Sequence, residues 1–223
     1  MARLWTDKLA TVEFRRNPSE ALQLTLTSPL TKTMTDTQRA EIVSDDSELL
    51  ILVDDEDREL GHLDKAACHD DSGILHRAFS LFIFNSQGEL LLQQRAPDKR
   101  LWGGYWSNSC CSHPRKNETM GTAVTRRCRQ ELGFSTELNF VYKFKYQAAF
   151  ANLGSEHELC SVYIGQFDGK PHVNSTEVSA WRWISPAQLN RELADPTKLF
   201  TPWLKLEWKR LNQDFAALFI NPE

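Results

Sequence analysis

The stretch SHPRKNETMGTAVTRRCRQELGF, residues Ser112 to Phe134, contains the helix around which the rest of the expected fold is arranged. Residues 117–132 are helical in composition, and Gly133 follows them at a position where glycine often ends a helix. Arg127 and Glu131 share one face of this helix, because residues four apart are neighbours. The two side chains are read either as a surface ion pair or as part of a binding site, and the helix by itself leaves both readings open.

Apolar runs typical of β-strands lie on both sides of this helix. Residues 49–53 form one such run, and the acidic turn after it predicts a hairpin. Residues 78–95 repeat the pattern, with a turn at Asn85 to Gly88. Further strands are expected at residues 139–150, 159–167 and 177–184, and further helices at residues 186–194 and 203–219. Strands in hairpins around one central helix predict an α+β fold, with a mixed β-sheet and flanking helices.

Length and charge limit the class of protein. The chain has 223 residues, which suits one domain of ordinary size with an added segment. Residues 1–46 lack periodicity and are expected to form a loosely ordered N-terminal extension or a lid, with the domain at residues 47–223. The net charge of −4 argues against a nucleic-acid partner. Because the sequence has no run of 18 apolar residues and no apolar signal-peptide core, we expect a cytoplasmic protein without a membrane partner.

The five cysteines are expected to be reduced thiols. Cys110 and Cys111 are adjacent, and a disulfide between neighbouring residues is strained. No C-x-x-C pair is present, which argues against a four-cysteine zinc site.

Three histidines and two glutamates have the spacing of a metal site. His69, His76 and His113 stand in one region, and Glu156 and Glu158 are two residues apart on an expected strand, so that both carboxylates face the same side. Together they would make a nitrogen and oxygen shell for Zn²⁺, Mn²⁺ or Mg²⁺. Each histidine alone is more commonly an ordinary surface or core residue, and spacing alone does not bring these side chains together.

The opening stretch also aligns without a gap to the Nudix signature G-x5-E-x7-R-E-U-x-E-E-x-G-U. Glu118, Arg126, Glu131, Gly133 and Phe134 match the signature, whereas Ser112, Arg127 and Gln130 replace a glycine and two glutamates. A Nudix hydrolase uses several carboxylates on this helix face to hold Mg²⁺ against a diphosphate. One remaining carboxylate, Glu131, would need the phosphate oxygens to complete the ion's shell. The pattern therefore indicates that diphosphate binding is kept and diphosphate hydrolysis is lost.

A basic cluster lies near the second expected hairpin. Arg95, Lys99 and Arg100 follow the strand, and Lys65 lies upstream. Charged side chains in turns are usually solvated. A bound diphosphate, however, requires such partners, because arginine binds phosphate with two hydrogen bonds and lysine as a point charge.

Five motifs occur in the order found in the type I isopentenyl-diphosphate Δ-isomerases, a Nudix-fold family that this chain resembles over about residues 48–210. The motifs are LHRAFS (Leu75 to Ser80), NSCCSHP (Asn108 to Pro114), RCRQELG (ending at Gly133), EHELC (ending at Cys160) and TPW (Thr201 to Trp203). The resemblance implies an enzyme that converts isopentenyl diphosphate to dimethylallyl diphosphate in isoprenoid biosynthesis. It implies a small-molecule prenyl diphosphate as the partner. We expect a monomer or weak dimer, although the sequence does not tell whether the chain dimerises.

The resemblance also implies roles for individual residues. Cys111 and Glu158 match the catalytic groups, Tyr146 matches a tyrosine that assists Glu158, and Cys110 falls on a variable position. The implied metal ligands are His69, His76, His113, Glu156 and Glu158. Glu131 matches the residue that contacts Mg²⁺ bound with the diphosphate. The positions that match substrate-binding residues are Lys65, Arg95, Lys99, Arg127 and Trp203. No flavin or nicotinamide cofactor is implied.

The implied reaction moves a proton from one carbon to another through a tertiary carbocation. Two acid–base groups on opposite faces of the substrate suit this chemistry, with Cys111 on one side and Glu158 on the other. The rival reading is a Nudix hydrolase of a nucleoside or sugar diphosphate, and a metal-binding module without turnover is a third. The loss of two carboxylates from the helix argues against the hydrolase.

Overall fold

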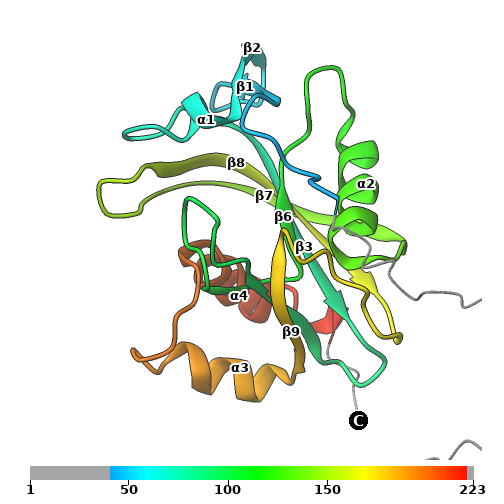
Figure 1. Cartoon of the computed structure of the whole chain (residues 1–223). Coiled ribbons are helices and arrows are strands. Elements are labelled where there is room, and N and C mark those ends of the chain that lie inside the picture. Colours follow the sequence, from blue (N-terminus) through cyan, green and yellow to red (C-terminus); the bar gives the residue numbers. More distant parts are fainter. Residues whose placement is uncertain (1–40, 220–223) are drawn as a thin grey trace, which may run out of the picture. The chain divides into compact units, whose positions relative to one another are not determined.

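Strand β3 (His76–Phe84) lies at the centre of a nine-stranded sheet in the computed structural model, which describes residues 41–219. Along its whole length β3 pairs in parallel with β8 (Ser155–Gln166), and β8 pairs antiparallel with β7 (Leu138–Ala149). On its other edge β3 pairs antiparallel with the short β6 (Cys110–Ser112). The sheet is therefore mixed, as the sequence predicted (Figure 1).

The remaining strands extend the sheet at its two ends. β4 (Leu90–Arg95) pairs with β9 (Val178–Ile184) and with β5 (Trp106–Ser107). β1 (Leu49–Val53) and β2 (Glu59–Asp64) form the first hairpin expected from the sequence. The second expected hairpin, in residues 78–95, is confirmed only at its turn.

That second hairpin is open because another strand occupies the edge it would need. β3 and β4 pair at Phe84 and Leu90 alone, next to the turn. Further along the same edge of β3, Phe79 to Leu81 pair with β6. The strand that carries the two adjacent cysteines therefore lies against the middle of β3.

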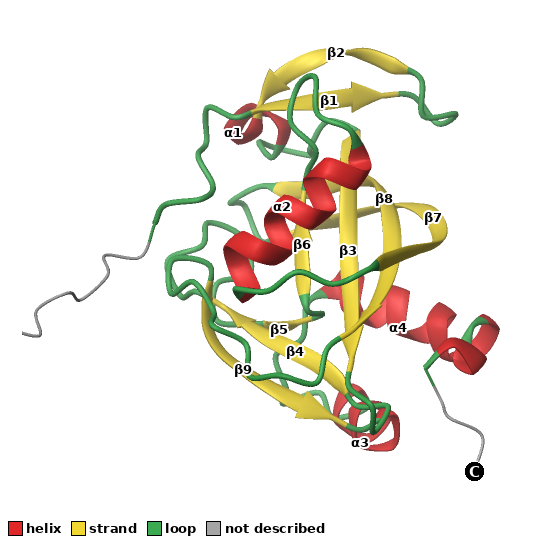
Figure 2. Cartoon of the chain, turned by 90° about the vertical axis from the view of Figure 1, so that its right-hand side faces the viewer, coloured by secondary structure: helices red, strands yellow, loops and turns green. Residues whose placement is uncertain are grey.

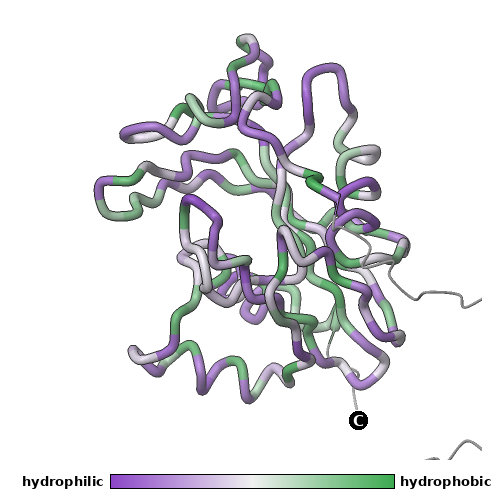
Figure 3. The backbone as a smooth tube through the Cα atoms, viewed as in Figure 1, coloured by the Kyte–Doolittle hydropathy of each residue, from purple (hydrophilic) through white to green (hydrophobic). Residues whose placement is uncertain are grey.

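Alternate side chains of β3 pack against helices on opposite faces of the sheet. Phe79, Leu81 and Ile83 lie in one core cluster with residues of α2 (Met120–Leu132). Phe82 and Phe84 lie in another with residues of α4 (Pro202–Asp214). Figure 2 shows α2 on one side of the sheet and α4 on the other. Figure 3 shows that the loop leading into α2 is hydrophilic, whereas hydrophobic residues follow the central strands.

Two predicted helix boundaries are wrong. α2 begins at Met120 rather than at residue 117, because Asn117 has a positive φ of 63° and Thr119 caps the helix by accepting a hydrogen bond from the Thr122 amide. α4 ends at Asp214 and does not reach residue 219, because Phe215 leaves the helical conformation and stacks on Tyr142 at a ring distance of 5.4 Å.

The remaining helices are short. α1 spans Lys65–Cys68, α3 spans Pro186–Leu193, and a 3₁₀ turn covers Ala216–Leu218. No helix between residues 41 and 219 has the length and apolar character that a membrane span requires.

The expected N-terminal extension is described only at its end. Residues 1–40 lie outside the described residues. Val43 is buried, and its carbonyl accepts hydrogen bonds from Arg115 and Arg127. The side chain of Ser44 contacts the Lys65 ammonium group. Residues 43–44 thus lie beside two of the cations that the sequence assigned to substrate binding.

Gly133 ends α2 in a conformation that only glycine adopts without strain. Its φ is 78°, and an added Cβ would lie 2.6 Å from the carbonyl oxygen of His172. Gly133→Ala should therefore lower the free energy of unfolding by at least ~1–2 kcal/mol, as measured by urea denaturation.

Gly121 provides the matched control, because it lies in the same helix with open space around it. Gly121→Ala should leave the protein as stable or raise its stability by roughly 0.5–1 kcal/mol. Equal effects at both positions would contradict this account of the helix end.

Candidate active site

The three histidines and two glutamates predicted as metal ligands lie together. One ligand atom from each of the five side chains lies within 4.8 Å of all the others. The imidazole Nε2 of His69 lies 2.9 Å from the Glu156 carboxylate, and the Nε2 of His113 lies 2.9 Å from Glu158. His76 Nε2 lies 3.9 Å from the same Glu158 oxygen.

The parallel pairing of β3 and β8 builds most of this group. His76 is the direct cross-strand neighbour of Glu158, and Glu156 lies two residues earlier on the same face of β8. His113 directly follows β6, and His69 directly follows α1. Residues far apart in the sequence are therefore held by the sheet and by the two segments that flank it.

The orientation of the imidazoles suits a divalent metal ion. The Nδ1 atoms of His69 and His76 lie 2.6 and 2.7 Å from backbone carbonyl oxygens, so these nitrogens carry the protons and the Nε2 atoms face the cluster. His76 Nε2 is buried and makes no hydrogen bond. A buried nitrogen without a hydrogen bond, beside two carboxylates, has the chemistry of a metal ligand. This group could therefore hold a divalent metal ion.

Burial and the neighbouring groups shift the pKa values within this cluster in different directions. Burial, then the neighbouring His69, lowers the pKa of His76 to about 4, so its ring is neutral, the form that binds metal. Burial raises the pKa of Glu156, but the charge and hydrogen bond of His69, together with Arg95 and His76, outweigh burial and lower the pKa to about 2. Burial, followed by the charge of Glu156, raises the pKa of the Glu158 carboxyl well above its ordinary value.

Loss of a ligand should remove the metal ion. His76→Gln should lower the metal content of the purified protein at least about tenfold after dialysis, measured by elemental mass spectrometry. His157→Gln is the matched control, because His157 lies between the two glutamates on β8 but points to the other face, where its Nδ1 lies 3.3 Å from the Gly73 carbonyl. Equal metal loss from both variants would contradict the assignment.

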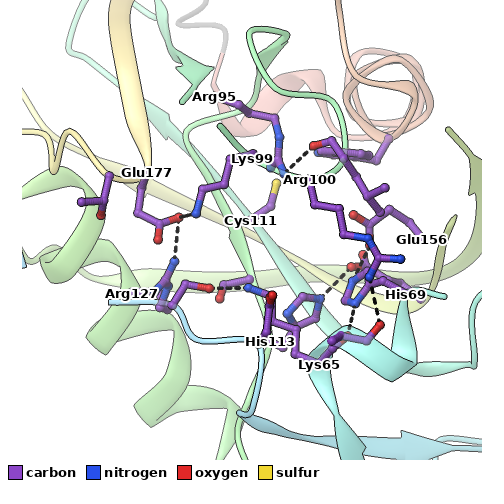
Figure 4. Close-up of a pocket in the computed structure, with 18 of the residues that line it drawn as sticks. Lys65, His69, Arg95, Lys99, Arg100, Cys111, His113, Arg127, Glu156 and Glu177 are labelled. Carbon is purple, nitrogen blue, oxygen red and sulfur yellow. Dashed lines mark hydrogen bonds and ion pairs between the residues drawn. The ribbon is translucent and has the colours of Figure 1, made fainter. Parts of the chain in front are cut away.

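The two adjacent cysteines point to opposite faces of the sheet. Cys110 pairs with Leu81 and is fully buried in the cluster under α2, whereas Cys111 pairs with Ser80 and lines a pocket of about 420 Å³. The Cys111 thiol donates a hydrogen bond to Asn108 Oδ1 at 3.0 Å. Burial, then the nearby Glu207 carboxyl, raises the pKa of this thiol. Figure 4 shows Cys111 within the pocket, between the basic residues and the histidines.

Glu158 and Tyr146 face the same pocket as Cys111. The Tyr146 hydroxyl donates a hydrogen bond to Glu158 Oε2 at 2.8 Å. The other oxygen, Oε1, contacts His113, so the carboxyl group is held from both ends. Burial and the charge of Glu158 raise the pKa of the Tyr146 hydroxyl well above its usual range, which keeps it a hydrogen-bond donor.

The four basic residues expected at a diphosphate also line this pocket. They are Lys65, Arg95, Lys99 and Arg127. Burial, then the charge of Lys99, lowers the pKa of Lys65. Burial opposes the charge of Arg127, but Glu131 and Glu177 outweigh it and raise the pKa of its guanidinium group. Arg127 is buried and the other three are half-buried, so four partly desolvated cations line one pocket and could bind an anion of more than one charge.

Glu177 occupies the centre of this basic group, and the sequence did not single it out. Its carboxylate lies 2.5 Å from Lys99 Nζ and 3.3 Å from Arg127 Nη2 (Figure 4). It directly precedes β9, whose pairing with β4 brings Val178 opposite Arg95. Because that pairing joins distant segments, no local pattern indicates the role of Glu177.

Glu131 and Gln130, the last two acidic positions of the Nudix signature, each interact with a different arginine of α2. Glu131 is buried, and its carboxylate lies 2.5 Å from Arg127 Nη2; it is not among the residues that line the pocket. Gln130 accepts a hydrogen bond from Arg126 at 3.2 Å. Arg127 and Glu131 thus form a buried pair, which excludes the surface ion pair that the helix pattern had left open.

Trp203 forms an aromatic wall of the pocket. It is buried, its indole nitrogen donates to Ser107 Oγ at 2.9 Å, and Trp102 meets it edge-on at 5.2 Å. The guanidinium of Arg95 lies 5.3 Å from the centre of its ring. The pocket therefore has an apolar aromatic part beside its basic part.

Similarity to solved structures identifies the fold. The NUDIX domain pattern matches residues 74–204. A crystal structure of a Deinococcus radiodurans protein is 23% identical, covers 73% of this chain and 98% of its own, and has a TM-score of 0.62. The sheet with α2 on one face and α4 on the other is therefore a Nudix fold, here with a group of metal-binding type and a basic pocket beside it.

Curated relatives identify the family within the Nudix fold to which the chain belongs. A Burkholderia multivorans protein is 48% identical over 70% of this chain and 88% of its own length, and a Serratia proteamaculans protein is 48% identical over 70% and 87%. Both are named isopentenyl-diphosphate Delta-isomerase. The chain belongs to the isopentenyl-diphosphate Delta-isomerases of the Nudix family.

Proposed function

We propose that this chain converts isopentenyl diphosphate to dimethylallyl diphosphate by moving a proton between two carbons. The observation that carries the proposal is that Cys111 and the Glu158–Tyr146 pair line one pocket together with four basic side chains. The names of the relatives give the same substrate.

In this proposal Cys111 and Glu158 are the two acid–base groups. One delivers a proton to the terminal carbon of the alkene, and the other removes a proton from the neighbouring methylene of the resulting cation. Tyr146 holds the Glu158 carboxyl and shares its proton, because its hydroxyl lies 2.8 Å from Oε2. Asn108 holds the thiol of Cys111 from the other side.

The basic part of the pocket binds the diphosphate. Lys65, Arg95, Lys99 and Arg127 supply the charges, and the guanidinium of Arg95 also lies over the ring of Trp203. We propose that Glu131 contacts an Mg²⁺ ion that arrives with the diphosphate, which requires the carboxylate to leave Arg127. Glu131 and Glu177 both pair with Arg127, and their negative charges would repel the diphosphate. Substrate binding must therefore rearrange these ion pairs.

The metal-binding group and Trp203 would act on the hydrocarbon end of the substrate, where the proton is moved. His69, His76, His113, Glu156 and Glu158 would hold a Zn²⁺, Mn²⁺ or Mg²⁺ ion. When bound, the ion would orient the Glu158 carboxyl. The face of Trp203 would stabilise the carbocation by ~2 kcal/mol in a site closed to water.

Incubation with isopentenyl diphosphate in D₂O tests the function. Mass spectrometry and NMR should detect dimethylallyl diphosphate that carries deuterium and should detect no free phosphate. The same enzyme should leave ADP-ribose, a sugar-nucleotide diphosphate, intact. Phosphate release without isomerisation would support the hydrolase in place of the isomerase.

A further inference from the structure

Glu207 is a carboxyl group enclosed by the protein beneath the reactive thiol. It lies on the buried face of α4, where its neighbours in the pattern are Trp203, Leu204, Trp208 and Leu211. Its side chain is fully buried, and no lysine or arginine among the described residues forms an ion pair with it. One carboxyl oxygen, Oε2, makes no hydrogen bond. A buried carboxyl without a cation is costly to ionise, so its presence calls for a role.

A chain of polar contacts joins Glu207 to Cys111. The Cys160 thiol lies 3.5 Å from Glu207 Oε1 and 3.5 Å from the Ser80 hydroxyl. The Ser80 hydroxyl lies 3.4 Å from the sulfur of Cys111. Ser80 and Cys160 are buried, and both favour the ionised form of Glu207. β3, β6, β8 and α4 each supply one member, so the chain depends on the fold and on no single segment.

The hydroxyl of Ser80 has one proton and more than one acceptor. Ser80 also hydrogen-bonds to Glu207, so an ionised Glu207 attracts this proton and leaves the sulfur of Cys111 facing the oxygen lone pairs of Ser80. A neutral Glu207 leaves the proton free to point at that sulfur. The charge of Glu207 therefore selects the direction of the hydrogen bond at Cys111.

We propose that Glu207 is a positioning residue for the reaction: through Ser80 it determines whether the sulfur of Cys111 has a hydrogen-bond donor. The proposal rests on the proposed function only in taking Cys111 as the reacting thiol. Cys111 passes through a thiolate whether it acts as the acid or as the base. The neutral form of Glu207 stabilises that thiolate, and the ionised form opposes it.

The charge of Glu207 changes within an accessible pH range. Burial raises its pKa to about 8, although Ser80 and Cys160 oppose this shift. Ser80 of β3 does not titrate. The groups that face Glu207 from the packed strands, or lie beside it on α4, are Cys111 of β6, Cys160 and Glu158 of β8, Tyr142 of β7 and Arg210 of α4.

The test compares the wild-type chain with Glu207→Gln, in which an amide of the same shape stays neutral at every pH. The rate of Cys111 alkylation by iodoacetamide is measured from pH 6.5 to 9.5, with peptide mass spectrometry to separate Cys111 from the other cysteines. We expect the two chains to react at similar rates at pH 6.5 and the variant to react about tenfold faster at pH 9.5, the effect of one pKa unit. The kcat of wild-type isomerisation should fall more steeply above pH 8 than that of the variant.

Ser80→Ala provides the second arm. In that background Glu207→Gln should change the pH dependence of alkylation by less than about twofold, because the link between the two groups is absent. Thermal unfolding of each variant checks that it is folded, and the wild-type pH profile needs no variant at all.

The outcomes separate this proposal from the proposed function. The deciding quantity is the Cys111 alkylation rate of Glu207→Gln divided by that of the wild-type chain. A ratio that does not change with pH overturns the role of Glu207, even if both chains isomerise the substrate. A ratio that rises with pH in chains that do not isomerise the substrate supports the role of Glu207 and rejects the function.

Discussion

Cys111→Ala should lower the rate of isomerisation by about 10³-fold, because a positioned acid–base group contributes on the order of 10²–10⁴. The protein should remain folded and keep its metal, since Cys111 is not a ligand of the metal group. The measurement is the initial rate of dimethylallyl diphosphate formation, together with metal content and thermal unfolding.

Cys110→Ala is the matched control one residue earlier. Its sulfur lies in the core under α2, away from the pocket. This variant should keep its isomerase activity within a few-fold and lose ~1 kcal/mol of stability through the small cavity that it leaves. Full activity in Cys111→Ala would show that the thiol does not react.

Glu158→Gln should lower the isomerisation rate by about 10³-fold or more, because the amide can neither give nor take the proton. Its shape is unchanged, so the side chain can still accept a hydrogen bond from Tyr146 with its carbonyl oxygen. The rate is measured under saturating substrate and metal, so that weaker metal binding does not account for the loss.

Glu156→Gln makes the same chemical change two residues earlier on the same face of β8. Glu156 contacts His69 but not Tyr146, so it is expected to be a ligand only. Its variant should recover most of its activity at high metal concentration. Equal losses in both variants at equal metal content would argue that Glu158 is also a ligand only.

The fold was largely predictable because its signals are local. Apolar runs, turn residues and the glycine after α2 indicated most strands and helices within a few residues of their bounds. The open hairpin was not predictable in this way. It depends on Phe79 to Leu81 pairing with β6, a contact between segments about thirty residues apart that competes with the local hairpin.

The site was predictable as a set of residues but not as an arrangement. Alternation along β8 placed Glu156 and Glu158 on one face, whereas the approach of His76 to Glu158 depends on the parallel register of β3 and β8, which no local pattern encodes. Glu177 was missed for the same reason. Glu207 did carry a signal, because it is a charged residue within the apolar stripe of a helix.

The register between β6 and β3 places two adjacent residues, Cys110 and Cys111, in the core and in the pocket. Packing of the core and the position of the pocket thiol are therefore linked. Cys110 is packed in the core and Cys111 lines the pocket, so any shift of the first moves the second. A larger side chain at position 110 would overpack the space under α2 and displace the neighbouring sulfur. Random mutagenesis should therefore yield variants with slow turnover whose substitutions lie wholly outside the pocket, in the α2 side of the core. Suppressors of such variants should map to small residues of that core, such as Ala123, instead of to residues that touch the substrate.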